Sequence, residues 1–134
     1  MREILFRGKR INSIKAGEWA EGFFMEWLNP CKNRKEARIQ TISEGGCIDL
    51  IHEVDPSTVG QYTGLKDKND KRIFEGDIFD WGYAGAKDLR YVVVYDAGLA
   101  AFVGERSFGF VSLDGIDIEI IGNIHDNPEL MEER

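Results

Sequence analysis

Alternating apolar and polar positions run through most of this chain and predict a fold of β-strands. In Ile116–Ile121, isoleucines alternate with Asp117 and Glu119, which is typical of a strand with one face in water. In Trp19–Leu28, apolar side chains fall on both sides of an extended chain, so we expect a strand that is buried on much of both faces. Leu89–Asp96 is rich in β-branched and aromatic residues, as central strands are. Further strands are predicted at Glu3–Arg7, Arg38–Ile42, Gly46–Ile51, Asp77–Tyr83, Leu99–Gly104 and Phe108–Leu113.

Helical periodicity is scarce, and turn residues separate the predicted strands. Asn127-Pro128-Glu129 combines a capping residue, a proline and an acid, and it predicts a short C-terminal helical turn. Asn29-Pro30 predicts a second helical turn through Lys32–Ala37. Asp96-Ala97-Gly98 predicts a three-residue hairpin loop in which Gly98 takes the left-handed position.

These patterns predict one mostly β domain that covers residues 1–134. The length is that of a single domain, and no internal repeat, low-complexity tract or linker interrupts it. Fifteen glycines at turn-like intervals fit many short connections between strands. We expect a curled antiparallel sheet or an irregular barrel-like core, followed by the short helical turn at the C-terminus.

Charge and composition narrow the classes of partner. Acidic residues outnumber basic ones by 24 to 17, and the net charge of −7 repels phosphate backbones and anionic membranes on average. Nucleic acid is therefore disfavoured as a partner, although a local basic patch leaves it open. No apolar run reaches the roughly 20 residues of a membrane helix, so no membrane is expected as a partner. The absence of a signal peptide and the two cysteines, Cys31 and Cys47, which fit no metal spacing, predict a cytoplasmic protein with free thiols.

Metal-binding patterns fail when their positions are checked. A calcium loop that starts at Asp67 would need a glycine where Arg72 stands and a glutamate where Ile78 stands. With only His52 and His125, the chain cannot build a three-histidine metal site. We therefore expect no metal and no cofactor.

Catalytic patterns are equally weak. His125 could polarise Ser107 or Ser112, but no nucleophile-elbow motif accompanies them. Glu75 and Asp77 flank Gly76 and could form a carboxylate pair, although an E-G-D turn that feeds a strand is more often a solvated bend. We expect no catalytic residues, and a small hydrolase is the lowest-ranked function.

Several segments of the chain resemble one protein family. The order of VDP at Val54–Pro56, TVGQYTGLKDKN, IFEGDI at Ile73–Ile78 and the terminal IIGNIHDNPEL is similar to the YopX family of phage and prophage proteins. The opening FRGK and GEW segments fit as well, so the resemblance covers both ends and the middle of the chain. It implies a mostly β, irregular fold and no particular biochemical activity. The family often has Asn-Gly where this chain has Asn69-Asp70, and a two-residue primed turn there would favour the glycine.

Two sets of surface residues are candidates for binding. Interleaved basic and aromatic residues suit single-stranded nucleic acid, and a basic cluster follows the aromatic strand that ends at Trp27. The cluster consists of Lys32, Arg34, Lys35 and Arg38. Outward-facing positions in the family segments predict contacts with another protein. They are Gln61, Lys66, Asp67 and Glu75.

The leading function is a phage- or prophage-encoded, non-enzymatic binding or assembly protein. The absence of a catalytic constellation and the abundance of aromatic strand residues favour it. We expect it to form a homo-oligomer, with a host or phage protein as a further possible partner. A nucleic-acid-associated accessory factor that uses the basic cluster is the alternative.

Overall fold

The computed structural model describes residues 4–42, 48–81, 89–106, 109–113 and 117–131. These residues form strands and two short 3₁₀ helices, and every strand pair with a described register is antiparallel. The prediction of a mostly β, antiparallel fold is therefore confirmed. Contacts divide the chain into two compact units, residues 1–62 and 63–134, so the single domain stays a prediction.

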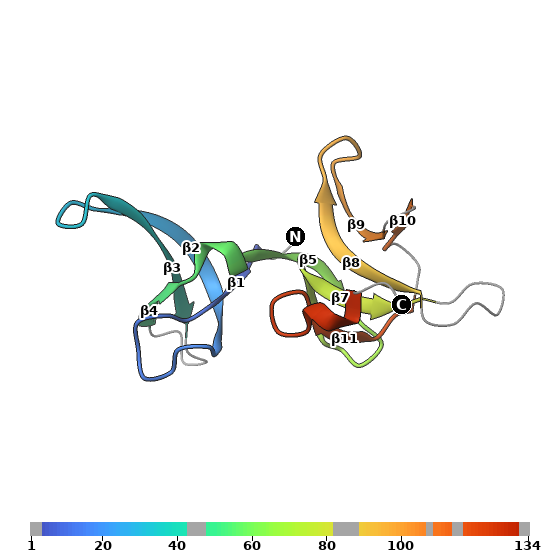
Figure 1. Cartoon of the computed structure of the whole chain (residues 1–134), viewed down its shortest axis with the longest axis horizontal. Coiled ribbons are helices and arrows are strands. Elements are labelled where there is room, and N and C mark those ends of the chain that lie inside the picture. Colours follow the sequence, from blue (N-terminus) through green and yellow to red (C-terminus); the bar gives the residue numbers. More distant parts are fainter. Residues whose placement is uncertain (1–3, 43–47, 82–88, 107–108, 114–116, 132–134) are drawn as a thin grey trace. The chain divides into compact units, whose positions relative to one another are not determined.

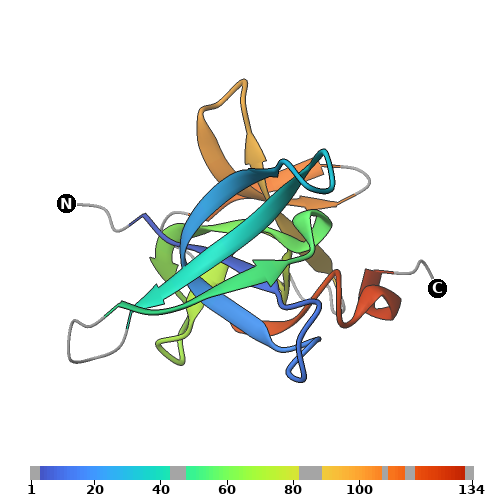
Figure 2. The same ribbon diagram turned by 90° about the vertical axis from the view of Figure 1, so that its left-hand side faces the viewer.

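The first unit is a set of neighbouring antiparallel strands (Figures 1 and 2). Its hydrogen-bonded order is β4-β3-β2-β1-β5. The strands are β1 (Phe6–Lys9), β2 (Trp19–Asn29), β3 (Arg34–Ile42), β4 (Ile48–Val54) and the start of β5 (Gly60–Lys66). The 3₁₀ helix η1 (Pro56–Thr58) begins as Asp55 accepts hydrogen bonds at one carboxylate oxygen from the Ser57 backbone N–H and hydroxyl.

Strand β2 changes partners at Gly22, which makes the sheet curl. Its first part pairs with β1 up to Gly22, and its second part pairs with β3 from Phe23 onward. The β3 backbone at Gln40 passes so close to Gly22 that no Cβ fits between them. The predicted curled sheet is the correct alternative, because the described strands leave open edges and close no barrel.

The core of the first unit lies on one side of this curled sheet. Alternation along β2 and β3 directs the same set of side chains inward, as expected for the period of two. The buried members are Ala20, Ala37, Ile39 and Val54, with Phe6, Phe24 and Val59 packed against them. This core is small, and the opposite side of the sheet has no such cover among the described residues.

A hairpin stands where the sequence predicts a helical turn at Lys32–Ala37, so that prediction is wrong. Asn29 pairs with Arg34 across a four-residue loop. The Asn29 side chain accepts hydrogen bonds from the backbone N–H groups of Cys31 (2.9 Å) and Lys32 (3.3 Å), and Asn33 takes a left-handed φ of 50°. This Asx-type turn reverses the chain instead of starting a helix.

The second unit is built around a five-stranded sheet of order β10-β9-β8-β7-β11. Its strands are β7 (Asp77–Asp80), β8 (Arg90–Asp96), β9 (Ala101–Arg106), β10 (Gly109–Ser112) and β11 (Ile120–Asn123), and the end of β5 neighbours β6 (Arg72–Phe74). The C-terminal turn is confirmed as the 3₁₀ helix η2 (Pro128–Met131). A separate core holds this unit together, with Ile73, Phe79, Tyr91, Val93, Leu113, Ile118 and Ile120 buried.

Two loops of the second unit differ from their predicted geometry. The β8–β9 loop has four residues, because Asp96 pairs with Ala101, and Ala100 instead of Gly98 has the positive φ of 52°. The β5–β6 turn runs from Asp67 to Lys71, and only Asp70, with a φ of 65°, is left-handed in it. It is therefore a three-residue loop and no two-residue primed turn.

The left-handed Asp70 gives a first prediction. Replacement by glycine, the residue common at this place in the resembling family, should raise the free energy of unfolding by about 0.5–1 kcal/mol, since glycine has no Cβ to strain the left-handed backbone. The lost ion pair with Lys66 (3.5 Å) is exposed and offsets little of this. Chemical denaturation measures the change. Asp70→Ala removes the same ion pair but keeps a Cβ, so it should destabilise; equal effects of the two variants would contradict the assignment.

Candidate functional site

One face of the first unit gathers the residues that are most suited to binding. Odd-numbered residues of β2 point away from the core, and the register places even-numbered residues of β3 and odd-numbered residues of β4 beside them. We call this surface the outer face. It consists of Phe23, Met25, Trp27, Arg34, Glu36, Arg38, Gln40, Ile51 and Glu53.

Large apolar side chains are exposed on the outer face. Phe23 and Trp27 are each 48% exposed, and Ile51 is 51% exposed. The prediction that the strand Trp19–Leu28 is buried on much of both faces is therefore wrong at its end, where Leu28 on the opposite side is also 61% exposed. The Arg38 guanidinium lies over the Trp27 ring, 5.3 Å from its centroid, and fixes the ring against the sheet. Exposed aromatic rings with polar neighbours make this face a candidate binding surface.

Three cations converge on one buried carboxylate at the hairpin end of the outer face. The Glu36 side chain is only 4% exposed, and Arg38 Nη2 donates to its Oε2 at 3.1 Å. Lys32 Nζ and Arg34 Nε lie 3.7 and 3.8 Å from Oε1, which also accepts a hydrogen bond from Asn29 at 3.0 Å. The carboxylate thereby orders the cations, and the cluster keeps an excess of positive charge.

Hydrogen bonds keep Glu36 ionised. The Asn29 amide and then the Arg38 guanidinium lower the pKa of the carboxyl, and the charge of Lys32 acts in the same direction, while burial opposes them. The net result is a pKa below the usual value of 4.5. The ion cluster is thus intact at neutral pH.

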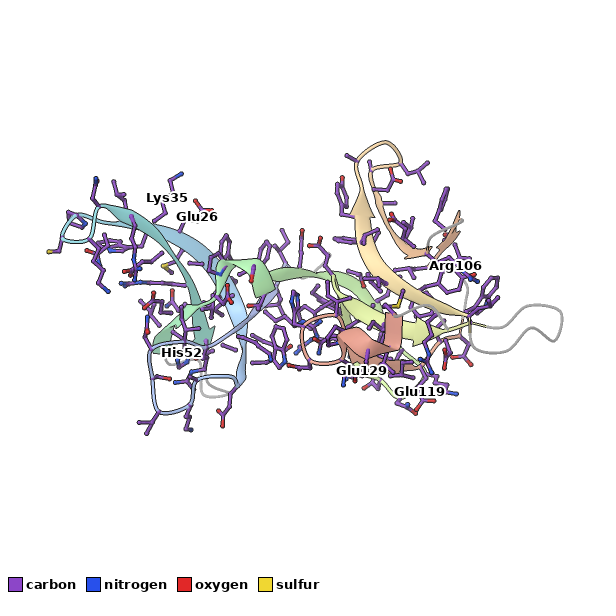
Figure 3. The ribbon with its side chains drawn as sticks, viewed as in Figure 1. Glu26, Lys35, His52, Arg106, Glu119 and Glu129 are labelled. Carbon is purple, nitrogen blue, oxygen red and sulfur yellow. The ribbon has the colours of Figure 1, made fainter. Side chains whose placement is uncertain are left out.

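Lys35 does not belong to the cluster that the sequence predicts. It alternates to the opposite side of β3, where its Nζ lies 3.9 Å from Glu26 (Figure 3). Lys32, Arg34 and Arg38 share one face through Glu36, whereas Lys35 pairs with Leu28 on the other face. The predicted set of four is corrected to three, because strand geometry separates neighbouring residues.

A hollow of about 380 Å³ adjoins the outer face at the edge strand β4. The segment Arg10–Ser13 forms one wall, and Arg38, Ile51, His52 and Glu53 form the rest. The Nε atoms of Arg10 and Arg38 are both buried and lack a hydrogen-bond acceptor. The Glu53 carboxylate is held by the Asn12 amide at 3.0 Å. The hollow thus combines two arginines with a carboxylate, and Arg10 Nη1 also lies 3.9 Å from Glu18.

The predicted protein-contact residues do not form one surface. Gln61 is half-buried in β5, and Lys66 is exposed and pairs with Asp70. Glu75 is half-buried at the turn before Gly76. Asp67 was expected to face outward, which is wrong: it is only 7% exposed, because its carboxylate accepts backbone N–H groups inside the second unit.

The candidate catalytic pairs are also separated or occupied. Asp77 is 1% exposed and accepts the Phe74 N–H at 2.8 Å, so it is no solvated partner for Glu75. His125 follows β11 and Ser112 ends β10, and these strands are the two opposite edges of the five-stranded sheet. Ser107 lies outside the described residues. Among those described, no group of three His, Cys, Asp or Glu residues is placed to hold a metal ion.

The net negative charge of the chain arises in the second unit. Residues 1–62 contain nine basic and nine acidic residues, whereas residues 63–134 contain eight basic and fifteen acidic ones. The outer face therefore belongs to an electrically balanced unit. Among the described residues, no helix is both long and apolar enough to cross a membrane.

Comparisons with known proteins place the chain beside others of the same fold. The family model described as "YopX protein" matches residues 16–132. The chain is similar to the crystal structure of protein EF1440 from Enterococcus faecalis, with a TM-score of 0.54 and 25% sequence identity over 98% of this chain and 100% of that chain. No curated protein matches it. The likeness therefore extends over nearly the whole length of both chains.

Proposed function

The chain belongs to the YopX family, and we propose that it is a phage- or prophage-encoded, non-enzymatic binding protein that holds its partner on the outer face. The observation that supports this proposal most is the pair of half-exposed aromatic rings, Phe23 and Trp27, beside an ordered cluster of cations. Trp and Arg are the residues that dominate binding energy at interfaces. The exposed thiol of Cys31 suits the reducing cytoplasm in which we expect the protein to act.

A non-enzymatic role is favoured by how the described polar groups are used. Glu36 orders cations, Asp67 and Asp77 bind backbone N–H groups, and His125 stands across the sheet from Ser112. The three carboxylates thereby stabilise the fold or order the surface. None of these arrangements joins a nucleophile to a base, which acid–base or nucleophilic catalysis requires.

Truncation of Trp27 tests the proposal. Tagged protein is incubated with lysate of a phage-infected or lysogenic host, and the retained material is identified by mass spectrometry for protein and by sequencing for nucleic acid. We expect Trp27→Ala to lose at least about nine-tenths of the specifically retained partner, because a central aromatic contact contributes about 2 kcal/mol or more. The exposed position of Trp27 should leave the thermal midpoint nearly unchanged.

Tyr95→Ala is the matched control, since Tyr95 is a half-exposed aromatic residue of the second unit. It should retain the partner as wild type does.

Light scattering on wild type, Trp27→Ala and Tyr95→Ala tests whether the partner is a second copy of the chain. A dimer that Trp27→Ala converts to the 15.2 kDa monomer identifies self-association. Equal retention by all three proteins would refute the outer face as the binding surface.

A further inference from the structure

The outer face combines stacking surfaces and ordered cations, and we propose that its partner is single-stranded nucleic acid. This inference rests on the proposed binding function and names the class of partner. The bases would stack on Phe23 and Trp27, and the phosphates would lie against Lys32, Arg34 and Arg38.

The aromatic residues are placed for stacking. Phe23 and Trp27 are four residues apart on the same side of β2, which is about 13 Å along a strand. Half of each side chain is open to solvent. The guanidinium of Arg38 over Trp27 fixes that ring without covering all of it. Single-stranded nucleic acid binds open sheets through such rings, because every base has an aromatic face.

The cations are placed for a phosphate backbone. Lys32, Arg34 and Arg38 share one carboxylate, and one net positive charge remains when Glu36 and Glu53, the register partner of Arg38, are both counted. Arginine presents its donors in a planar fork that matches phosphate. At the β4 edge of the same face, Arg10 and Arg38 line the hollow together with Glu53.

Charge distribution on this face suits a phosphate backbone beside stacked bases. Lys32, Arg34 and Arg38 stand around Glu36 at the hairpin end of the face, next to the Trp27 ring. The net charge of −7, which disfavours nucleic acid for the chain as a whole, arises in residues 63–134. The first unit carries equal numbers of acidic and basic residues and does not repel phosphate on average.

Fluorescence anisotropy with labelled 12-mers of deoxythymidine and of uridine tests the inference on the full-length protein. We expect salt-sensitive binding, with log K falling by about 2 to 3 for each unit of log salt, since each phosphate contact to a single strand contributes about 0.7. A duplex of the same length should bind at least about tenfold more weakly, because its bases are not open to stacking.

Variants separate the two kinds of contact. Trp27→Ala should weaken binding about tenfold or more and leave the salt slope unchanged. Trp27→Phe, which keeps an aromatic ring, should retain most of the wild-type affinity. Arg34→Gln should weaken binding and reduce the salt slope by about 0.7. Lys35→Gln is the control, since it removes an equal charge from the opposite face of β3 and should change neither quantity.

The outcomes distinguish this inference from the proposed function. Oligonucleotide binding with the pattern above supports both. Failure to bind either 12-mer, while lysate still yields a protein that depends on Trp27, overturns the inference and leaves the binding face in place. Oligonucleotide binding that is equal for duplex and single strand, or that Lys35→Gln weakens as much as Arg34→Gln does, also overturns it.

Discussion

Replacement of Gly22 by alanine is expected to destabilise the protein by about 3 kcal/mol or more. The added methyl group would overlap the carbonyl oxygen of Gln40 and lie 2.9 Å from its carbonyl carbon and 3.2 Å from Thr41 Cα. These are backbone atoms of β3, so no side-chain rotation relieves the overlap. The strands themselves would have to separate.

The surroundings of Gln40 explain why the strand cannot move cheaply. In the register of the sheet, Gln40 pairs with Phe23 on one side and with Ile51 on the other. A shift of β3 away from Gly22 would disturb both pairings and the contacts of the buried Ile39. Hydrogen bonds and core packing both oppose the shift, and the cost exceeds that of an ordinary small-to-large substitution.

Chemical and thermal denaturation measure the effect. We expect the thermal midpoint of Gly22→Ala to fall by about 10 °C for a chain of this size. Gly98→Ala is the control, because it adds the same methyl group in an exposed turn where its nearest neighbour is one side-chain oxygen, 3.2 Å away. It should change stability by no more than about 0.5 kcal/mol. Similar losses in the two variants would show that Gly22 has no special role.

Alternation identified most strands, because each has one apolar side, but it failed along the start of β3. There the two apolar residues, Ala37 and Ile39, lie on the core face, while the outer face carries the charged residues. Because the solvent side of β3 carries ion-paired residues, the sequence of this strand has the polar composition of a loop. The Asx-type turn at Asn29 also led to the incorrect prediction of a helical turn, because asparagine followed by proline also begins helices.

The candidate site was predictable only in part. Lys32, Arg34 and Arg38 are visible as a run of positive charge, but Glu36 then reads as a residue that weakens the patch. In the structure it orders the three cations. The exposure of Trp27 and its place beside Arg38 depend on which strands become neighbours. The four-residue turn between Asn29 and Arg34 sets that register, and the helical turn expected at Lys32–Ala37 concealed it.

The second large effect is expected at Asp67, where replacement by asparagine should cost about 2–3 kcal/mol. Its Oδ1 accepts the backbone N–H groups of Asn69 (2.8 Å) and Lys71 (2.9 Å), and its Oδ2 accepts that of Ile120 (3.1 Å). An asparagine would keep the first two bonds but turn its NH₂ toward the Ile120 N–H. Two donors would then face each other in a buried site.

The effect should depend on pH in a defined direction. Burial raises the pKa of the Asp67 carboxyl, but the three backbone N–H groups and the charge of Lys71 outweigh it, so the pKa lies below its usual value of 3.8. A depressed folded-state pKa stabilises the protein at pH values above the unfolded pKa, and this stabilisation is lost as the pH falls through the folded pKa. The difference in unfolding free energy between wild type and Asp67→Asn should therefore be constant above about pH 5 and shrink below about pH 4.

Asp117→Asn provides the control, since it removes the same charge from an exposed position of the second unit. Its stability should stay within about 0.5 kcal/mol of wild type at every pH. A difference for Asp67→Asn that does not shrink in acid would indicate a steric cause instead of lost ionisation.

Asp67 and Gly22 also test together whether the chain is one domain. Gly22 lies in the first unit and Asp67 in the second. In a single cooperative domain, each substitution lowers the midpoint of the same transition, because neither unit unfolds without the other. If the units were independent domains, Gly22→Ala would shift one transition and Asp67→Asn would shift a different one. Denaturation followed by tryptophan fluorescence and by circular dichroism separates the cases, and coincident transitions in both variants are the result that the predicted single domain requires.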